Sequence, residues 1–441
     1  TILGAESTKG VWASSFIFSE LSFQIARAIQ SFALTEDGKN HLVELWSPAG
    51  TLPEQQDGYG IYPDRIFFIS TLTPADVNEL FTVPAIQSLA LSLNDTDGSI
   101  LVFLSQYLEI NIVQNRNTDV FSPEHILSLS DQLSLFEYRP TTSTDLNYKR
   151  FHTLINGIDN NTPLYNTQFG SVRHFVSVEE IAKNTGANEN KLCSHYFAVV
   201  LCDGDDLGKA IEKINSVESY QSFQSGMNTF VERAGQLVQE FGGQMVYAGG
   251  DDLFFFAPVL GKLKGDDLNQ NSSDPHLSPL IALVAQLQQD FSSCMSTAIP
   301  GLEATLSFGI HIQYYKAPLY EGILKARSNL NQLSKQNQFI LEASEDHKTK
   351  NTLTVSYQPH RSPVSLASLP LPMDFFSKAN IFLCGICLNP ESYPARILKR
   401  YDAMAEYLQI IISDPYGEPS CKAFLENLIR SREECIEGDI R

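Results

Sequence analysis

The stretch that decides the fold is VYAGGDDLFFF, residues 246–256, where two apolar runs flank Gly249-Gly250-Asp251-Asp252. Glycine permits the positive φ values of a tight hairpin, so we predict a strand–turn–strand hairpin over 244–258. Upstream, residues 199–209 read VVLCDGDDLGK, an apolar strand that ends in an acidic turn and opens a helix. We expect this strand to lie beside the hairpin.

The pattern around these two stretches predicts the order strand, helix, strand, strand, helix, strand. The expected strands are 195–202, 244–247, 252–258, 304–314 and 352–357, and the expected helices are 206–214, 220–241, 279–298 and 320–335. A polar insertion is expected over 261–278. This order is the split βαβ arrangement of a ferredoxin-like palm.

The rest of the chain completes a three-part prediction of fold class α+β. Helices over 11–30 and 122–136 and strands over 41–46 and 61–69 are assigned to a first palm-like domain, residues 1–185, with a degenerate site. The second palm covers 190–360. Residues 361–441, with helical stretches over 395–412 and 421–434, are expected to form a helical C-terminal domain.

The composition excludes several classes of protein. No run of 18 or more apolar residues occurs and no signal peptide is evident, so we expect no membrane association. Seven scattered cysteines fit reduced thiols and a cytoplasmic location. A formal net charge of −20 argues against this chain alone binding a nucleic-acid backbone, which favours clustered Lys and Arg.

One cysteine pair has a metal-like spacing. Cys384 and Cys387 form a CxxC motif of the zinc-knuckle type. Their neighbours are apolar and read as a buried strand, which favours buried thiols.

The acidic residues of the two stretches predict a two-metal site. Asp203, Asp251 and Asp252 offer carboxylate oxygens, which suit two Mg²⁺ or Mn²⁺ ions. Two such ions would relieve the repulsion among the acids, activate a 3′-hydroxyl and stabilise leaving pyrophosphate. Candidate nucleotide-binding residues are Gly204, Asp205, Asp206, Gly208, Gly249, Gly250 and Lys325, and Lys209 and Arg327 are further candidates to neutralise phosphate. Asp-Gly-Asp-Asp by itself is also a common turn or a calcium loop.

These motifs resemble a known family. DGDDLGK (203–209) and YAGGDDL (247–253) look like the palm of the large polymerase/cyclase-like subunit of type III CRISPR effector complexes, especially the Cmr-type branch. TKGVWASSF (8–16) is similar to the Trp-containing helix that opens its first palm, and IYPDR (61–65) resembles a following segment. The likeness covers roughly residues 5 to 360 and is most specific from 195 to 357.

The resemblance implies an RNA-guided cyclase. Such subunits make cyclic oligoadenylate from ATP when the guide RNA of their complex pairs with a target transcript. By motif position Asp203, Asp251 and Asp252 would hold the metals, Gly249 and Gly250 would form the turn near the nucleotide, and Lys325 would contact phosphate. Other effector subunits, guide RNA and target RNA are the implied partners.

The chain also departs from the family pattern. It contains no His-Asp dipeptide, so no nuclease activity of the HD type is expected from it, and it has no Cys cluster for a zinc module between the palms. Two alternatives to the cyclase remain open: a catalytically silent structural subunit of the same complex, and a free-standing GGDEF-like nucleotide cyclase.

Overall fold

The computed structural model divides the chain into two compact units, Thr1–Ile381 and Phe382–Arg441. It describes residues 5–371 apart from 6, 49, 51, 53–54, 56–57, 116–122, 138–144, 170–174, 185–191, 213, 215, 264–275, 337–338, 341–347 and 359–363. The predicted helices over 395–412 and 421–434 and the Cys384–Cys387 motif lie outside these residues. No helix in the described part is both long and apolar enough to cross a membrane.

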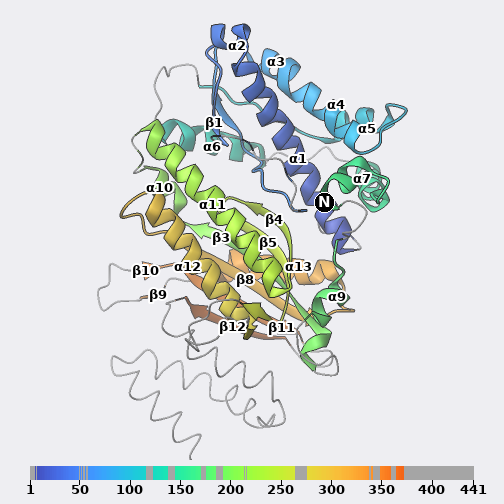
Figure 1. Ribbon diagram of the computed structural model, residues 1–441, viewed down its shortest axis with the longest axis vertical. Coiled ribbons are helices and arrows are strands. Elements are labelled where there is room, and N and C mark those ends of the chain that lie inside the picture. Colours follow the sequence, from blue (N-terminus) through green and yellow to red (C-terminus); the bar gives the residue numbers. More distant parts are fainter. Residues whose placement is uncertain are drawn as a thin grey trace, which may run out of the picture. The chain divides into compact units, whose positions relative to one another are not determined.

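A six-stranded sheet forms the centre of the second half of the chain (Figure 1). Its order is β12-β11-β8-β3-β5-β4, with β3 (Tyr196–Asp205), β4 (Gln244–Gly249), β5 (Asp252–Pro258), β8 (Thr305–Tyr314), β11 (Thr352–Gln358) and β12 (Ser365–Pro370). Only β11 and β8 pair in parallel. The inner strands β8-β3-β5-β4 have the ferredoxin-like order, and the predicted α+β class is confirmed.

Helices cover both faces of this sheet. They are α10 (Leu207–Glu212), α11 (Val217–Phe241), α12 (Leu280–Ala298), α13 (Leu319–Ser328) and the π-helical turn η5 (Asn329–Ser334). Because strand side chains alternate, Val200 and Phe255 pack in one core with α11 and α12, whereas Val199 and Phe256 pack in a second core with α1 and α13. Gly242, at φ +94°, ends α11 where the sequence predicts its end.

Further short strands lie outside the six-stranded sheet and form two-stranded sheets of their own. They are β6 (Leu260–Leu263), β7 (His276–Pro279), β9 (Phe339–Ile340) and β10 (Lys348–Thr349). The insertion expected over 261–278 therefore has paired ends, because β6 and β7 form an antiparallel ladder. The sheet also continues past the predicted boundary at 360, since β12 pairs with β11.

The first half is mostly helical. Its elements are α1 (Thr8–Ala33), α2 (Glu36–Asn40), β1 (Glu44–Ser47), β2 (Phe67–Ile69), α3 (Pro74–Val77), the π-helical turn η2 (Asn78–Thr82), α4 (Val83–Ser92), α5 (Ser99–Tyr107), α6 (Pro123–Glu137), α7 (Asp145–Gly157), α8 (Pro163–Phe169), α9 (Val178–Lys183) and the 3₁₀ turn η3 (Leu192–His195). In its described residues β1 and β2 form one two-stranded antiparallel sheet. That this half is a degenerate palm stays a prediction.

The strand predicted over 61–69 is shorter in the structure, and the reason lies in its first residues. Only Phe67–Ile69 pair with β1. Pro63 has no backbone N–H to donate to a ladder. Gly60, just before the predicted strand, pairs with β4 instead: its carbonyl oxygen accepts a hydrogen bond from the Ala248 N–H at 2.8 Å. The first half therefore joins β4 at the edge of the large sheet.

Candidate metal centre

The Gly-Gly-Asp-Asp hairpin places two acids at the end of β4 and β5. Gly249 pairs with Asp252, so Gly250 and Asp251 are the two turn residues. Gly250 has φ +74°, whereas the φ of Asp251, the other turn residue, is not positive. This pattern is typical of a type II′ hairpin. At Gly249 a Cβ would lie 1.8 Å from the Tyr247 hydroxyl, so both glycines are required by the local geometry.

The neighbouring strand β3 brings the third acid. Cys202, next to Asp203, pairs with Leu253, next to Asp252. Carboxylate oxygens of Asp203, Asp251 and Asp252 all lie within 4.8 Å of one another. The structure thus brings together the three residues that the sequence predicts as metal ligands.

Gly204 allows the close approach of the two strands. Its N–H donates to Asp251 Oδ2 at 3.2 Å, and a Cβ on Gly204 would lie 2.6 Å from the same oxygen. Any side chain at this position would push Asp251 away from Asp203. Gly204 is predicted from the sequence to contact the nucleotide. The structure shows another reason for glycine at this position, namely the room that Asp251 needs beside it.

Repulsion among the acids shifts their titration. Burial, followed by the negative charge of Asp203, raises the pKa of Asp251 to about 6. Burial, followed by the charges of Asp251 and Asp203, raises the pKa of Asp252 to about 8. Asp252 is nevertheless exposed as a residue, so a cation from solvent can reach the cluster and remove the repulsion.

Lys335 is the functional residue that the sequence analysis missed. Its Nζ lies 2.7 Å from Asp203 Oδ2 and 3.0 Å from Asp205 Oδ1, and it donates to the carbonyl oxygens of Asp203 and Gly204. Burial alone would lower the pKa of Lys335, but Asp203 and Asp205 raise it. A buried ammonium therefore balances part of the negative charge of the site.

Asp205 is not part of the cluster of three acids, and its carboxylate already has several hydrogen-bond donors. Its carboxylate accepts from Ser307 Oγ at 2.8 Å, Thr305 Oγ1 at 2.9 Å, the Asn351 N–H at 3.0 Å and Lys335. It ties β3 to β8, to the start of β11 and to Lys335. Its geometry fits a positioning role instead of the nucleotide contact predicted for it.

Asp206 and Gly208, the next predicted site residues along the chain, are not part of the carboxylate cluster. Asp206, at φ +54°, forms ion pairs with Lys350 at 3.0 Å and Lys209 at 3.5 Å. Although partial burial opposes it, these lysines lower the pKa of Asp206. Gly208 lies in α10, where a Cβ would meet only Leu127, at 4.0 Å.

Lys325 does not lie at the carboxylate cluster. It donates to Gln358 Oε1 at the far end of β11. Strand β8 lies beside both residues and gives the distance between them. Asp203 pairs with Ser307 of β8, and Gln358 pairs with Gln313 of β8. Six strand residues, or roughly 20 Å, therefore separate Asp203 from Gln358. The predicted phosphate role of Lys325 is therefore corrected, and Arg327 is an exposed residue of the same helix.

A sequence signal for the missed network does exist. Along β8, Thr305, Ser307, His311 and Gln313 recur with a period of two, broken only by Gly309. This polar face is buried under α13 and η5, where every group needs a partner. The pattern predicts polar contacts from the helix that follows β8, although not which lysine supplies them.

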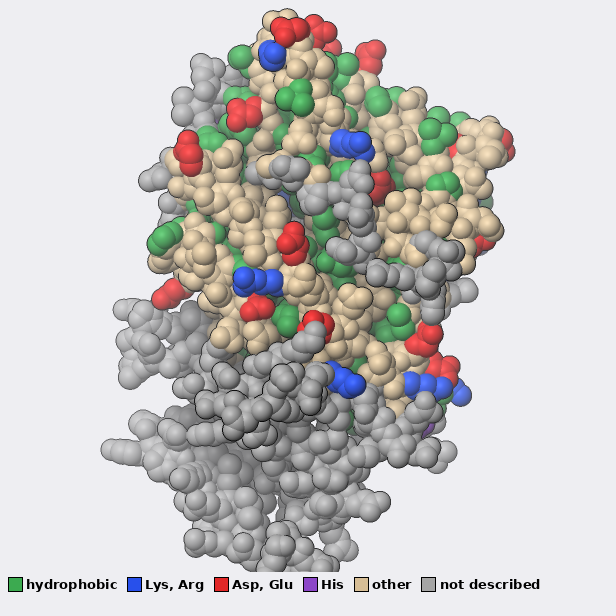
Figure 2. Space-filling view, in the orientation of Figure 1, with side chains coloured by type: hydrophobic (Ala, Val, Ile, Leu, Met, Phe, Trp, Pro, Cys, Tyr) green, Lys and Arg blue, Asp and Glu red, His purple; other side chains and the backbone are tan. Residues whose placement is uncertain are grey.

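Charge on the surface is dispersed. In Figure 2 the Lys and Arg side chains of the described residues stand mostly singly, interspersed with Asp and Glu. This distribution agrees with the net charge of −20 and with the absence of a broad basic patch from this view.

Comparison with known proteins finds a family that the region of the site resembles. Residues 196–339 match the family described as Cas10/Cmr2, second palm domain. The CRISPR system Cmr subunit Cmr2 of Pyrococcus furiosus is 27% identical over 165 residues, which are 32% of this chain and 17% of that relative. The match thus spans less than a fifth of the relative's length.

Solved structures with similar folds are more distant. A Csm1-Csm4 cassette in complex with AMPPNP aligns with TM-score 0.41 and 14% identity, over 79% of this chain and 54% of that chain. A type III-B Cmr-beta complex in its apo state aligns with TM-score 0.30 and 14% identity, over 82% and 31%.

Proposed function

Because residues 196–339 match the family described as Cas10/Cmr2, second palm domain, we propose that this chain is the cyclase subunit of a type III CRISPR effector complex. It would convert ATP to cyclic oligoadenylate when the guide RNA of the complex pairs with target RNA. Its partners would be the other effector subunits and these RNAs, in the cytoplasm.

The observation that carries the proposal is the cluster of Asp203, Asp251 and Asp252. Three carboxylates with oxygens within 4.8 Å of one another form a hard-oxygen ligand set. Burial, followed by the charges of the neighbouring acids, raises the pKa values of Asp251 and Asp252, and a divalent cation would offset both effects. This donor set fits two Mg²⁺ or Mn²⁺ ions.

The surrounding residues support nucleotidyl transfer. When bound, the ions would activate a 3′-hydroxyl and stabilise the pyrophosphate that leaves. Asp203 would be held in place by Lys335, which is anchored in turn by Asp205. The turn at Gly249 and Gly250 would let the phosphates approach the backbone closely.

The proposal is tested with the assembled complex, purified with its guide RNA. Addition of ATP, Mg²⁺ or Mn²⁺ and cognate target RNA should yield cyclic oligoadenylate, detected by mass spectrometry. The double variant Asp251→Ala/Asp252→Ala should assemble normally and yield none. No cyclic product from the intact complex under these conditions would overturn the proposal.

One observation favours a second candidate, a silent scaffold. Lys335 pairs at 2.7 Å with Oδ2 of Asp203, so one carboxylate of the cluster already has a cationic partner without a metal ion. Calorimetry separates the two candidates: a scaffold should bind no ATP in a Mg²⁺-dependent manner, whereas the cyclase should, and the binding should disappear in Asp252→Asn.

A further inference from the structure

Strand β4 contains a β-bulge shortly before the Gly-Gly-Asp-Asp turn. Met245 pairs with Phe255 on β5. The next pair along the strand joins Tyr247 and Phe254, so Val246 has no partner on β5. A bulge bends its strand and changes where the following side chains point, and a shift by one residue turns every side chain to the opposite face. The place of this bulge therefore decides where the acids of the turn lie.

A segment of the first half holds the outer edge of the bulge. The Gly60 N–H donates to the carbonyl oxygen of Val246 at 3.4 Å, and the Gly60 carbonyl oxygen accepts from the Ala248 N–H at 2.8 Å. A Cβ on Gly60 would lie 3.4 Å from the ring of Tyr247, so the backbone of Gly60 also packs against that ring. Three consecutive residues of β4, including the bulged one, thus contact Gly60.

The segment around Gly60, which we call the strap (Gln55 and Gly58–Arg65), is fixed to α1 by buried side chains. Ser19 Oγ donates to Gln55 Oε1 at 2.6 Å and accepts from the Tyr62 N–H at 2.9 Å. Gln55 Oε1 also accepts from the Ile61 N–H at 3.2 Å. Ser19 and Gln55 are both buried, where polar groups need partners, so these bonds hold the strap in one conformation.

Helices α1 and α8 hold the start of the strap from two further sides. Gln55 Nε2 donates to Glu20 Oε2 of α1 at 2.9 Å. Gln168 of α8 donates through its Nε2 to the carbonyl oxygen of Gln55, and its Oε1 accepts from the Gly58 N–H at 3.3 Å. The strap is therefore tied to two helices before it reaches β4.

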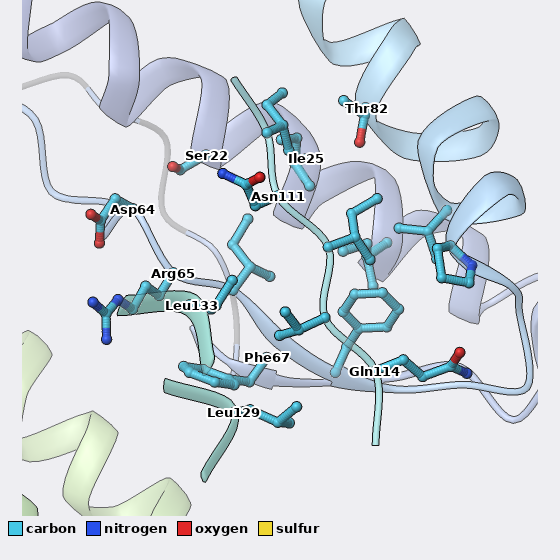
Figure 3. A pocket seen from close by; sticks show the side chains of 18 of the residues that line it. Ser22, Ile25, Asp64, Arg65, Phe67, Thr82, Asn111, Gln114, Leu129 and Leu133 are labelled. Atoms are coloured by element: carbon cyan, nitrogen blue, oxygen red, sulfur yellow. The ribbon is translucent and has the colours of Figure 1, made fainter. Parts of the chain in front are cut away.

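The other end of the strap is fixed to α6. Arg65 donates through Nη2 to Ser134 Oγ at 3.1 Å and through Nη1 to Ser130. Figure 3 shows this end beside a cavity of about 560 Å³, with the guanidinium of Arg65 pointing away from the apolar side chains of Ile25 and Leu133 that line it. Because both ends are held by helices of the first half, these helices determine the position of the strap on β4.

We propose that Ser19 and Gln55 are positioning residues for the Gly-Gly-Asp-Asp hairpin. They hold the strap, Gly60 of the strap holds the bulge at Val246, and the bulge fixes the register in which the turn presents Asp251. This inference rests on the proposed function for what the hairpin does, but not for how the hairpin is held. The two can therefore fail separately.

The first experiment measures amide hydrogen exchange in the full chain by NMR, without metal or ATP. Ser19→Ala removes the hydroxyl that bonds to the strap. Ser14→Ala is its matched control, because Ser14 is buried in the same helix and its hydroxyl donates to Val11 of that helix. Exchange of the Ala248 amide should become at least about tenfold faster in Ser19→Ala and stay unchanged in Ser14→Ala.

The same spectra report the position of the acid. The Gly204 N–H donates to Asp251 Oδ2 at 3.2 Å, so a displaced turn removes its acceptor. The Gly204 amide should therefore also exchange faster in Ser19→Ala. Mn²⁺ affinity, measured by the electron paramagnetic resonance of free Mn²⁺, should fall about tenfold in Ser19→Ala and stay unchanged in Ser14→Ala. A merely structural role for Ser19 would lower stability without lowering the Mn²⁺ affinity of the folded chain.

A second variant changes the strap where it meets β4. In Gly60→Ala the new Cβ would lie 2.7 Å from Ser19 Cβ, whereas Gly157→Ala, its control, places a Cβ with nothing within 4 Å. Gly60→Ala should show the same changes as Ser19→Ala, and larger ones; if it fails to fold, Ser19→Ala still decides.

The proposal is overturned if Ser19→Ala and Ser14→Ala exchange alike at Ala248, or if Ala248 exchanges faster while Gly204 does not. Absence of Mn²⁺ binding to the unaltered chain would instead overturn the proposed function, and the two amides would still decide whether the strap positions the hairpin.

Discussion

The two halves of the described molecule are built differently. In the second half β3 pairs on both sides and unites a six-stranded sheet. In the described residues of the first half, β1 and β2 form a two-stranded sheet, and a cavity of about 560 Å³ lies beside them. The difference teaches that the central strand of the second half serves both its core and its site: Asp203 lies on that strand, and the first half has no such acid cluster among its described residues.

The largest expected effect separates the halves by chemistry. Asp252→Asn should lower cyclic oligoadenylate synthesis by about a thousandfold, because loss of a metal ligand removes several kcal/mol of transition-state stabilisation. Asp131→Asn, on the exposed surface of α6, should leave the rate within a factor of about two. Product formation by the assembled complex measures both, and equal losses would abolish the assignment of chemistry to the second half.

Core substitutions should also distinguish the halves. Phe256→Ala removes a fully buried ring beneath the large sheet and should cost about 3–5 kcal/mol of unfolding free energy. Phe67→Ala should cost only about 1 kcal/mol, because that ring is partly exposed and already borders a cavity. Urea denaturation followed by circular dichroism compares them, and a similar cost for both would show that the first half is packed as tightly as the second.

Ion pairs give a smaller contrast. Lys335→Met should cost about 3 kcal/mol, because it leaves the carboxylate of buried Asp205 without its ammonium partner. Lys39→Met, in the first half, should cost less than about 0.5 kcal/mol, because Lys39 and Glu36 pair in solvent. The same denaturation experiment applies without divalent ions. A mild effect of Lys335→Met would mean that water or another group satisfies Asp205.

The smallest effect concerns pH. Folding raises the pKa of Asp251 to about 6 and of Asp252 to about 8, so the folded state binds more protons than the unfolded chain. Stability should therefore fall as the pH rises from about 4 to 8, by a few degrees in melting temperature, and Mg²⁺ should restore it. Asp252→Asn should flatten the slope.

A first-half acid provides the control for this slope. The hydroxyl of Thr73 lowers the pKa of Asp76, so its contribution is complete above the usual pKa and is lost only as the pH falls below it. Asp76→Asn should leave the slope between pH 5 and 8 unchanged. If it flattens that slope as Asp252→Asn does, the pH dependence does not arise from the metal centre.

The sequence predicted the second half well because its signals are local and strong. The continuous apolar strands, the glycine pair and the glycine at the end of α11 are each determined by neighbours in the chain. Lys335 was not predicted because it directly follows the π-helical turn η5, which ends at Ser334. A π-helical turn changes which residues face the sheet, relative to the regular α-helix that the sequence predicts. Lys325, which the sequence predicts as the phosphate contact, also carries an ammonium group, but it lies at the opposite end of the sheet from the carboxylate cluster.

In the first half the sequence signals were less decisive. Residues 61–69 look like one strand, but only Phe67–Ile69 pair with β1, whereas Gly60, just before this stretch, pairs with β4. Which partner an extended segment takes depends on contacts far away in the chain, and periodicity does not contain that information.

The backbone bridge at Gly60 has a consequence for solubility. β4 is an edge strand, and unpaired edges invite association with other chains. Gly60 shields this edge, and it can do so because a Cβ there would lie 2.7 Å from Ser19 of α1, so only glycine fits. The first half thus protects the second half from self-association, and separating them should produce aggregates detectable by light scattering.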